Sequence, residues 1–343
     1  MPSGDAVAYA IVVARLRPLL LLAGLVVTVV LTYLALRDID FNAFLDALAD
    51  GDPEWFAASF AVFGAAYAVR VLRWWALFEA GARPPFRALV RAMLVGDFLT
   101  SLLPVLRPGE VARVIVLHRE AQTPRSVALG TVVTERVQDA SALLLLLFAA
   151  VPFAPAVTWL RGATVLLAVF AAGLLVTFAA VRRFGSRPLA FVLRPVALLP
   201  GLSAARTELA AAGILRGLSG LRSARVGLTT FTLSGLSWFG IAVSFALALR
   251  GAGLELGLDA GILVLVATTF SHLLPALPAS VGIFEAAALV ALEPYGVEEA
   301  RALSAAVVIH VLSFIPFLVV GPFALRGHAV ILGAFGNLSL RPR

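Results

Sequence analysis

The sequence predicts an all-α integral membrane protein, and both its composition and the spacing of its apolar blocks support this fold class. Hydrophobic residues fill 61% of the 343 positions, charged residues only 14%, and the mean hydropathy is +0.99. A soluble globular domain has about 45–50% apolar and about 25% charged residues. The excess falls into blocks of about 18–25 residues, the length with which a helix crosses about 30 Å of hydrocarbon. Because a helix satisfies its backbone polar groups internally, repeated blocks of this length indicate a helical bundle.

The charge distribution and the lack of cysteine argue against a nucleic-acid-binding protein and against a protein with disulfides or thiolate metal sites. The net charge is +7, and all 27 basic residues are arginine. The arginines lie between the apolar blocks, where cytoplasmic loops collect them, so we expect no nucleic-acid partner. A coding bias explains the absence of lysine most simply, since Ala, Val, Leu and Gly are also in excess. The chain has no cysteine, which excludes disulfides and thiolate metal sites.

The first predicted spanning helix is Pro18–Leu36. Arg15 and Arg17 precede it and place the N-terminus in the cytoplasm, because cytoplasmic segments carry the excess of basic residues. The apolar run is too long for the core of a signal peptide and lacks a small-residue cleavage site, so we expect no cleaved leader. The acidic loop Asp38–Glu54 follows and is expected outside.

The second predicted helix, Trp55–Phe78, returns to the cytoplasm and is followed by a basic turn. The next apolar stretch, Ala92–Leu103, is too short to span and stops at Pro104. If it crossed the membrane, the arginines after it and the longest basic loop, 182–225, would lie outside. A re-entrant hairpin that enters from the cytoplasm and returns to it agrees with both length and charge.

Three more spanning helices surround the long basic loop. Val127–Val151 is expected to cross outward and Leu160–Val181 to return. The loop 182–225 then lies in the cytoplasm, and Val226–Leu249 crosses outward again.

The short-segment pattern recurs near the end of the chain. Ala260–Leu274 is short and ends at Pro275, and Gly282–Leu292 is short too. The loop after them is acidic on balance, so a second re-entrant hairpin, entering from outside, fits. The last helix, Leu303–Leu325, ends in the cytoplasm before a basic tail.

These elements make one polytopic membrane domain over 1–343, with six spanning helices and two re-entrant hairpins. The first half covers 19–151 and the second half 160–325. We expect a multi-pass protein of the inner (plasma) membrane with both termini in the cytoplasm. A bundle of eight spanning helices is the alternative architecture.

The two hairpins resemble each other in sequence, which predicts an inverted repeat. Each contains Leu-Leu-Pro-x-Leu, around Pro104 and Pro275, and each has a Gly and a Glu after a second proline. Short segments interrupted by Gly and Pro at matching positions of two halves point to the binding site of a transporter. A pair of proline-kinked helices without a function is the alternative interpretation.

Ionisable residues inside the predicted helices cost about 2.5–3.5 kcal/mol each to insert, so they indicate a partner or a function. They fall into three groups, which are Arg107, Glu110 and Arg113 in the first hairpin, Glu135, Arg136 and Asp139 in the helix after it, and Glu285 alone near the second hairpin. Spacings of three and four place Glu110 with Arg113, and Glu135 with Asp139, on one helix face each.

We expect these groups to line a polar cavity at the centre of the bundle. Arginines there would bind an anionic headgroup by charge-assisted hydrogen bonds, and the carboxylates would balance them or take up a proton. Helix N-termini in the hairpins would add free N–H donors. The alternative is that the groups pair among themselves and only pin the bundle. Arg70 and Arg73 either belong to the site or snorkel to the cytoplasmic interface.

The sequence predicts neither an enzyme nor a cofactor. His272 and His310 are isolated, without a second ligand at metal spacing, so both are expected to be packing residues. We find no metalloprotease, nucleophile-elbow, P-loop or dinucleotide-binding motif. A lipid transferase inside the membrane would have to use Glu135, Asp139 or Glu285, and nothing in the sequence activates them.

Four motifs occur in an order that resembles a known family. They are Arg70-x-x-Arg73-Trp74, then Leu-Leu-Pro104-x-x-Arg107-x-Gly109-Glu110-x-x-Arg113, then Glu135-Arg136-x-x-Asp139, and last Pro278-x-Ser280-x-Gly282-x-x-Glu285 followed by Tyr295-Gly296-Val297. This pattern is similar to the lysylphosphatidylglycerol synthase transmembrane family, a flippase-like membrane domain found with or without a synthase domain. The resemblance extends from about Leu19 to Leu325. It departs from the family at Phe98–Ser101, where a polar stretch is usual, and at Ala279 and Val281, where Pro or Gly is usual.

The resemblance implies that the charged, Gly, Pro and Ser residues of these motifs bind substrate. It implies translocation between leaflets of an anionic or aminoacylated phospholipid, or of a polyprenyl-phosphate-linked lipid. Without the synthase domain, the chain is not expected to aminoacylate lipid. The expected partners are a lipid with an anionic headgroup and a glycosyltransferase or synthase, and a homo-oligomer is compatible with the sequence.

Two hypotheses therefore remain from the sequence. A translocase predicts that Arg107→Ala or Arg113→Ala abolishes transport and leaves folding largely intact. A non-transporting membrane subunit, which anchors or regulates a cell-envelope glycosyltransferase or lipid-modifying enzyme, predicts tolerance of central charge changes and sensitivity of the loop 182–225.

Overall fold

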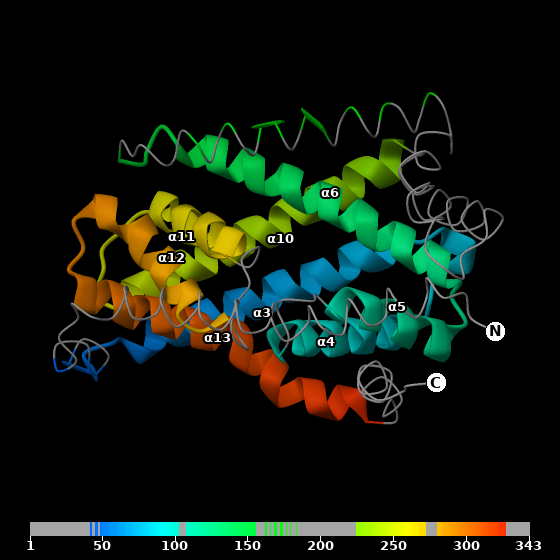
Figure 1. Ribbon diagram of the computed structural model, residues 1–343, viewed down its shortest axis with the longest axis horizontal. Coiled ribbons are helices and arrows are strands. Elements are labelled where there is room, and N and C mark those ends of the chain that lie inside the picture. Colours follow the sequence, from blue (N-terminus) through cyan, green and yellow to red (C-terminus); the bar gives the residue numbers. More distant parts are fainter. Residues whose placement is uncertain are drawn as a thin grey trace, which may run out of the picture.

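The structure is a computed structural model that describes residues 51–102, 108–155, 224–271 and 280–326, with single residues of 42–50 and 162–183. In these ranges the fold consists of eight α-helices and two short 3₁₀ helices, with no strand (Figure 1). The α-helices are α3 (Pro53–Ala76), α4 (Phe86–Leu102), α5 (Pro108–Ala121), α6 (Arg125–Ala150), α10 (Ala224–Gly251), α11 (Leu258–Ser271), α12 (Ile283–Leu292) and α13 (Glu299–Leu325), and the 3₁₀ helices are η1 (Ala80–Ala82) and η5 (Glu293–Tyr295). The all-α class is confirmed, and eight described helices match the count of the alternative architecture.

The helices fall into two length classes. α3, α6, α10 and α13 have 24, 26, 28 and 27 residues, whereas α4, α5, α11 and α12 have 17, 14, 14 and 10. At about 1.5 Å per residue, each long helix exceeds about 30 Å and each short helix falls below it. α3, α10 and α13 are also apolar enough to span a membrane. α6 has the length but carries Glu135, Arg136 and Asp139 at mid-helix.

Several predicted elements lie outside the described residues. These are the first helix, Pro18–Leu36, and most of Leu160–Val181 and of the loop 182–225. Among the described elements, α4 begins six residues before the predicted Ala92, and α13 begins four residues before Leu303. The predicted starts followed the apolar runs, but backbone hydrogen bonds continue a helix through polar residues at its exposed end.

The four short helices form two pairs in opposite halves of the molecule. Figure 1 shows α4 and α5 side by side in one half, and α11 and α12 in the other. α4 and α5 approach so closely that a Cβ on Gly109 would lie 2.0 Å from the carbonyl oxygen of Gly96. α12 begins after Gly282, whose φ of 83° lies in the region that favours glycine. The two pairs cover the described parts of the predicted hairpins, and the inverted repeat stays a prediction.

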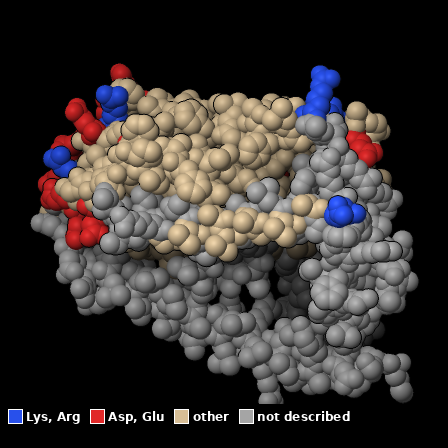
Figure 2. Space-filling model, turned by 90° about the horizontal axis from the view of Figure 1, so that it is seen from above, with Lys and Arg blue, Asp and Glu red and all other residues tan. Residues whose placement is uncertain are grey.

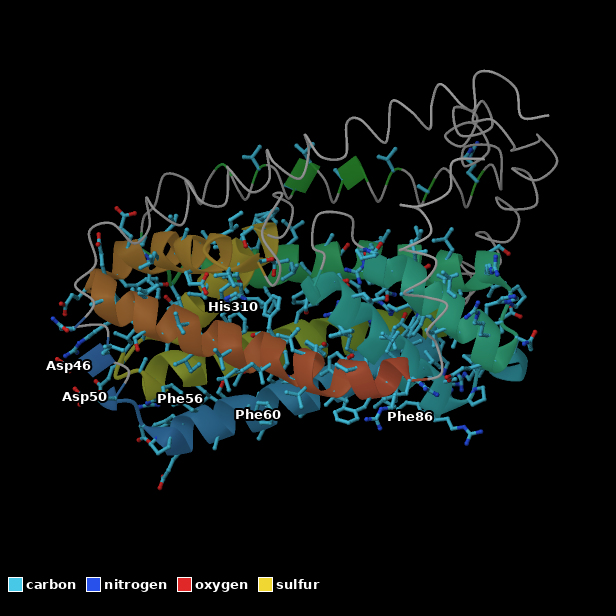
Figure 3. All side chains as sticks on the ribbon, turned by 60° about the horizontal axis from the view of Figure 1, so that its bottom comes forward. Asp46, Asp50, Phe56, Phe60, Phe86 and His310 are labelled. Carbon is cyan, nitrogen blue, oxygen red and sulfur yellow. The ribbon has the colours of Figure 1, made fainter. Side chains whose placement is uncertain are left out.

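Charged side chains gather at the two ends of the long helices. The acidic end holds Glu54, Glu255, Asp259, Glu293, Glu298 and Glu299, and the arginine end holds Arg83, Arg87, Arg91, Arg119, Arg125 and Arg326. On the face shown in Figure 2, an uncharged band separates charged atoms at the two ends. Large apolar side chains such as Phe60, Leu145 and Val319 are exposed along the helices between them. Figure 3 places Phe60 and Phe86 on the outer surface. An uncharged band with exposed large apolar side chains is the surface that a membrane protein presents to lipid.

The tightest pair of long helices is α3 with α10, which run antiparallel. Ser59 Oγ donates to the Ser244 carbonyl oxygen at 2.7 Å, and Ser244 Oγ donates to the Ser59 carbonyl oxygen at 2.9 Å. Near the centre, a Cβ on Gly240 would lie 2.9 Å from the Ala66 Cβ. Small residues that allow close backbone approach, with hydroxyls bonded across the interface, are the usual means of helix association in membranes.

Two apolar clusters lie on either side of the centre. One packs α10, α11, α12 and α13 around residues such as Leu263 and Ile309. The other packs the end of α3 with α4 and α5 around Trp74 and Met93. The charged residues of α3, α5 and α6 lie between these clusters, and so does the candidate site.

Candidate functional site

Glu135 of α6 is the centre of a buried ionic network. It is fully buried, and its two carboxylate oxygens accept hydrogen bonds from Arg113 of α5 at 3.0 and 2.8 Å. Arg136 donates to Glu135 Oε1 at 2.7 Å, and Arg73 Nη2 lies 3.3 Å from the same oxygen. Glu135 thereby connects α3, α5 and α6, and several cations compensate the desolvation of one carboxylate.

Asp139, one turn further along α6, joins this network to α10. It accepts a hydrogen bond from Arg73 Nη1, a second from Trp238 Nε1 at 2.8 Å and a third from Ser234 Oγ at 3.2 Å. Arg73 is completely buried, so it does not snorkel to the interface as one sequence alternative allowed. Its role in the structure is to hold the two α6 carboxylates.

Arg70 and Arg73 differ in the hydrogen bonds that their guanidinium groups make. Its nearest carboxylate oxygens, on Asp139 and Glu135, lie 3.8 and 3.9 Å away, beyond hydrogen-bond distance. Its guanidinium carbon lies 5.5 Å from the ring centre of Trp238, and its buried Nε has no hydrogen-bond partner. Arg73, Arg113 and Arg136 also have a buried Nε without a hydrogen-bond partner. Arg70 is distinguished by its terminal nitrogens, which make no hydrogen bond to a carboxylate among the described contacts, whereas those of Arg73 and Arg113 do.

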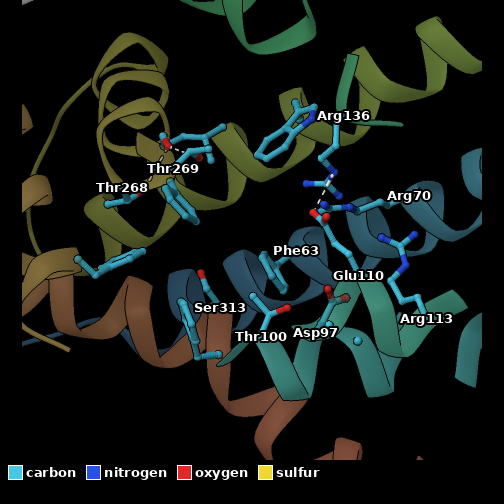
Figure 4. Close-up of a pocket in the computed structure, with 17 residues that line it drawn as sticks. Phe63, Arg70, Asp97, Thr100, Glu110, Arg113, Arg136, Thr268, Thr269 and Ser313 are labelled. Carbon is cyan, nitrogen blue, oxygen red and sulfur yellow. Dashed lines mark hydrogen bonds and ion pairs between the residues drawn. The ribbon is translucent and has the colours of Figure 1, made fainter. Parts of the chain in front are cut away.

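A pocket of about 250 Å³ opens beside this network (Figure 4). One end is charged, the other is mainly apolar, and hydroxyl groups lie near the middle and at the apolar end. The charged end is formed by Arg70, Asp97, Glu110, Arg113 and Arg136, the hydroxyls belong to Thr100, Thr268, Thr269 and Ser313, and the apolar end is formed by Phe63, Phe245, Leu265, Phe284 and Phe314. Residues from both helix pairs line it, so any relative motion of the pairs changes its shape.

The charged end contains carboxylates as well as cations. In Figure 4 Glu110 points toward Arg136, and Glu110 Oε1 lies 3.6 Å from Arg136 Nε. Asp97 accepts a hydrogen bond from Tyr67 Oη at 2.7 Å. The pocket thus offers guanidinium donors together with acidic acceptors, a combination suited to a polar headgroup.

The structure brings most of the predicted site residues together. Those that line the pocket are Arg70, Gly109, Glu110, Arg113 and Arg136, and those directly behind its charged wall are Arg73, Glu135 and Asp139. Arg107 and Pro278 lie outside the described residues. Gly109 also has a packing role, because its Cβ position is filled by α4.

The second helix pair contributes its own buried polar group. Glu285 Oε2 accepts a hydrogen bond from the Gly282 N–H at 2.7 Å, and Glu285 Oε1 lies 2.5 Å from His310 Nδ1. The interpretation of Glu285 as alone and of His310 as isolated is therefore wrong. They lie 25 residues apart in the chain, and only the packing of α12 on α13 brings them together. Ser280, with a φ of 58°, is buried just before this helix.

Several site residues were missed by the sequence analysis. Tyr67, Trp238 and Ser234 bind the carboxylates, and Trp74 stacks beneath Arg113 with 4.1 Å between the guanidinium carbon and the ring centre. A signal was available for Tyr67, which lies three residues before Arg70 on the same face of α3. Trp238 and Ser234 lie in an apolar helix without any such neighbour.

The fold and the site define an α-helical membrane protein with two short helix pairs around a pocket that is charged at one end and apolar at the other. The sequence matches the lysylphosphatidylglycerol synthase TM region over residues 21–321, and the chain belongs to this family. This region is the transmembrane, non-catalytic part of the family and is linked to lipid metabolism or translocation. The resemblance inferred from the four motifs is confirmed over nearly the same range. No curated protein matches the chain.

Proposed function

We propose that this chain is a lipid translocase, which moves the headgroup of an anionic or aminoacylated phospholipid, or of a polyprenyl-phosphate-linked lipid, between leaflets. One observation carries the proposal: a single pocket, lined by both helix pairs, has guanidinium groups at one end and aromatic side chains at the other. A lipid likewise has a charged headgroup at one end and apolar chains at the other. Family membership, which links the chain to lipid metabolism or translocation, supports the same conclusion.

The headgroup binds at the charged end. Arg70 has donors without hydrogen-bond partners, and Arg136 is about one-third exposed toward the pocket. A guanidinium binds phosphate oxygens through two parallel N–H groups, which gives geometry as well as charge. Arg113 and Arg73 keep the α6 carboxylates neutralised, so that these do not repel the phosphate. Glu110 and Asp97 moderate the positive charge and allow the headgroup to leave.

Alternating access follows from the placement of the helix pairs. α4 and α5 form the wall of the charged end, and α11 and α12 contribute Leu265, Thr268 and Phe284 to the other wall. Transporters built from inverted repeats open to one side and then the other by rocking one repeat against its partner around a fixed site. The two halves, 19–151 and 160–325, are the units that move in this proposal, within one domain over 1–343.

The proposal places the chain in the inner (plasma) membrane with both termini in the cytoplasm, so the arginine end faces inward. The chain carries out no covalent chemistry, and a cell-envelope glycosyltransferase or synthase supplies or consumes its lipid. Under the rival hypothesis of a non-transporting subunit, the loop 182–225 binds such an enzyme, and the pocket has no substrate.

The test is a leaflet-exposure assay. Purified protein is reconstituted in liposomes that contain a trace of fluorescent phosphatidylglycerol or of a fluorescent polyprenyl phosphate, and dithionite bleaches the label in the outer leaflet. We expect lipid to cross with wild-type protein and not with Arg70→Gln. Arg301→Gln is the matched control, because Arg301 is exposed at the acidic end, far along α13 from the pocket.

Arg70→Gln replaces the Arg113→Ala test suggested by the sequence. Arg113 is buried against Glu135, and loss of one partner of a buried ion pair costs about 3–5 kcal/mol, so a lack of transport would not distinguish a binding defect from misfolding. Crossing at the wild-type rate in Arg70→Gln contradicts the headgroup site. No crossing with any lipid, from folded protein, favours the non-transporting subunit.

A further inference from the structure

Glu285 and His310 form a second buried polar centre, separate from the arginine network. Each side chain is at most 10% exposed, and Oε1 and Nδ1 are 2.5 Å apart. At this distance the two atoms share a hydrogen bond, so one of them carries a proton that lies between them. The other carboxylate oxygen accepts the Gly282 N–H at the start of α12. One side chain therefore holds the N-terminus of α12 and, through His310, attaches it to α13.

The charge of this pair depends on how many protons it holds. With a neutral imidazole and an ionised carboxylate the pair has a net charge of −1, and with one more proton, on His310 Nε2, it is a neutral ion pair. An isolated buried charge is far less favourable than a neutral pair in an apolar environment. The neutral pair therefore suits the packed arrangement, and the charged pair suits an arrangement in which Glu285 reaches water.

The pair is mechanically connected to the pocket. The His310 ring stacks on Phe284 with 4.4 Å between ring centres, and Phe314 meets its face edge-on at 4.5 Å. Phe284 and Phe314 both line the apolar end of the pocket. Figure 3 places His310 among the helices rather than on the surface. Separation of α12 from α13 would pull Phe284 away from this stack and open the pocket wall.

The other titratable groups of the described elements around the pair lie elsewhere. On the helices that pack against α12, they are at the acidic end, where Asp259 of α11 bonds Tyr295 and where Glu299 and Arg301 begin α13. Arg301 is nine residues from His310, or about 14 Å along the helix axis. Across the pocket, the groups on α3, α4, α5 and α6 are Arg70, Asp97, Glu110, Arg113 and Arg136. None of these has an ion pair with Glu285 among the described contacts.

We propose that Glu285 and His310 are a proton-binding site that closes α12 against α13, so that proton uptake closes this side of the pocket and proton release opens it. Intramembrane carboxylate and histidine pairs commonly relay protons. The consequence for transport, which rests on the proposed function, is that headgroup passage is coupled to proton movement. The proton site itself requires only the geometry of α12 and α13.

The absence of cysteine allows a direct test of this closure. Val290→Cys on α12 and Val319→Cys on α13, both at exposed positions, accept spin labels in the otherwise cysteine-free chain. The distance between the labels is measured in nanodiscs between about pH 5 and about pH 8, the range in which histidine ordinarily changes charge. We expect the distance distribution to shift to longer values as pH rises, and the shift to disappear in Glu285→Gln and in His310→Gln.

Glu298→Gln and His118→Gln are the matched controls, since they change the same residue types outside the pair, and both should keep the shift. A wild-type distance that does not respond to pH, or a shift that survives in both pair variants, overturns the proton site. Lipid crossing is measured separately, with the same variants reconstituted without spin labels in liposomes. A pair-dependent shift with crossing that follows pH supports the coupling. A pair-dependent shift with no crossing supports the proton site and contradicts the translocase instead.

Discussion

Arg113 of α5 donates two parallel hydrogen bonds to Glu135 of α6, with Nη1 to Oε1 at 3.0 Å and Nη2 to Oε2 at 2.8 Å. This contact fixes the first helix pair to α6 at the depth of the pocket. Gly96 makes room for it, because a Cβ there would lie 2.4 Å from Arg113 Cγ. The cation that lines the pocket is therefore positioned by a carboxylate behind it and by a glycine in front of it.

Glu135→Gln should destabilise the protein more than Arg113→Leu. Glu135 has Arg113, Arg73 and Arg136 as partners, whereas Glu135 is the single carboxylate bonded to Arg113 in the described part of the chain. Removing Glu135 leaves two buried guanidinium groups undercompensated, for which we expect about 3–5 kcal/mol. Arg113→Leu leaves Glu135 with two cations and should cost less. Unfolding of the purified protein in detergent, followed by circular dichroism, measures both.

Arg136→Gln is the control for this series. Arg136 is more than one-third exposed, so its ion pairs are weakened by solvent and should contribute less than about 1 kcal/mol to stability. Equal destabilisation by Glu135→Gln and Arg136→Gln would show that burial of the network does not control its energy.

Gly109→Ala should separate α4 from α5. A Cβ at Gly109 would lie 2.0 Å from the Gly96 carbonyl oxygen and 2.1 Å from Thr100 Oγ1, and the backbone oxygen cannot move without shifting the helix. We expect a loss of stability of about 2 kcal/mol, in the range of overpacked cores, together with loss of lipid crossing. Gly64→Ala is the same change in α3 with no atom within 4 Å, and it should be neutral or stabilising because alanine favours helix.

Composition and the lengths of the apolar blocks were sufficient to predict the all-α membrane class. The short stretches before Pro104 and Pro275, with the sign of the loops around them, predicted two hairpins in opposite halves, and α4–α5 and α11–α12 occupy those halves. Helix ends were less predictable. α4 extends back to Phe86 because the side chains of Arg87 and Arg91 lie at the end of the helix, where they can reach water while the backbone stays helical. Arg91 even bonds the Ala324 carbonyl oxygen of α13, a contact that no local pattern could indicate.

The composition of the site was more predictable than its pairing. Spacings along one helix indicated that Glu135 and Asp139 share a face, but not that Arg73 and Trp238 of other helices meet Asp139. The same reason hid the bond between Glu285 and His310. A single polar residue in each of two apolar helices is a weak signal. The sequence does not determine the rotation of a helix about its axis, so it does not show which residues of two helices face each other.

Tyr295 provides a pH-dependent contact at the acidic end, outside the spanning segments. Burial, and then the hydrogen bond that Tyr295 donates to Asp259 Oδ2 at 2.6 Å, raise the pKa of the tyrosine above its ordinary value of 10.0. Because the folded pKa is the higher one, the contact stabilises the fold fully below about pH 10 and loses this contribution as pH rises beyond that value.

Tyr295→Phe should therefore cost about 1.5 kcal/mol at neutral pH, the range of a hydrogen bond to a charged group. Above about pH 10 the difference between wild type and variant should shrink. Thermal unfolding of both proteins over this range measures the difference, and a difference independent of pH would mean that the hydroxyl–carboxylate bond is not its source.

Glu110→Gln should strengthen the binding of an anionic lipid and slow its release. Glu110 lies 3.6 Å from Arg136 at the edge of the pocket and is about one-third exposed, while Arg136 keeps its bond to Glu135. The substitution therefore adds one net positive charge to the pocket and should change stability by less than about 1 kcal/mol. In liposomes with increasing fractions of fluorescent phosphatidylglycerol, half-maximal crossing should occur at a lower fraction and the maximal rate should fall. Glu298→Gln, the same change on an exposed residue of the acidic end, should alter neither value. If the charged groups only pin the bundle, Glu110→Gln will also leave both values unchanged, since the pin formed by Arg113 and Glu135 stays intact.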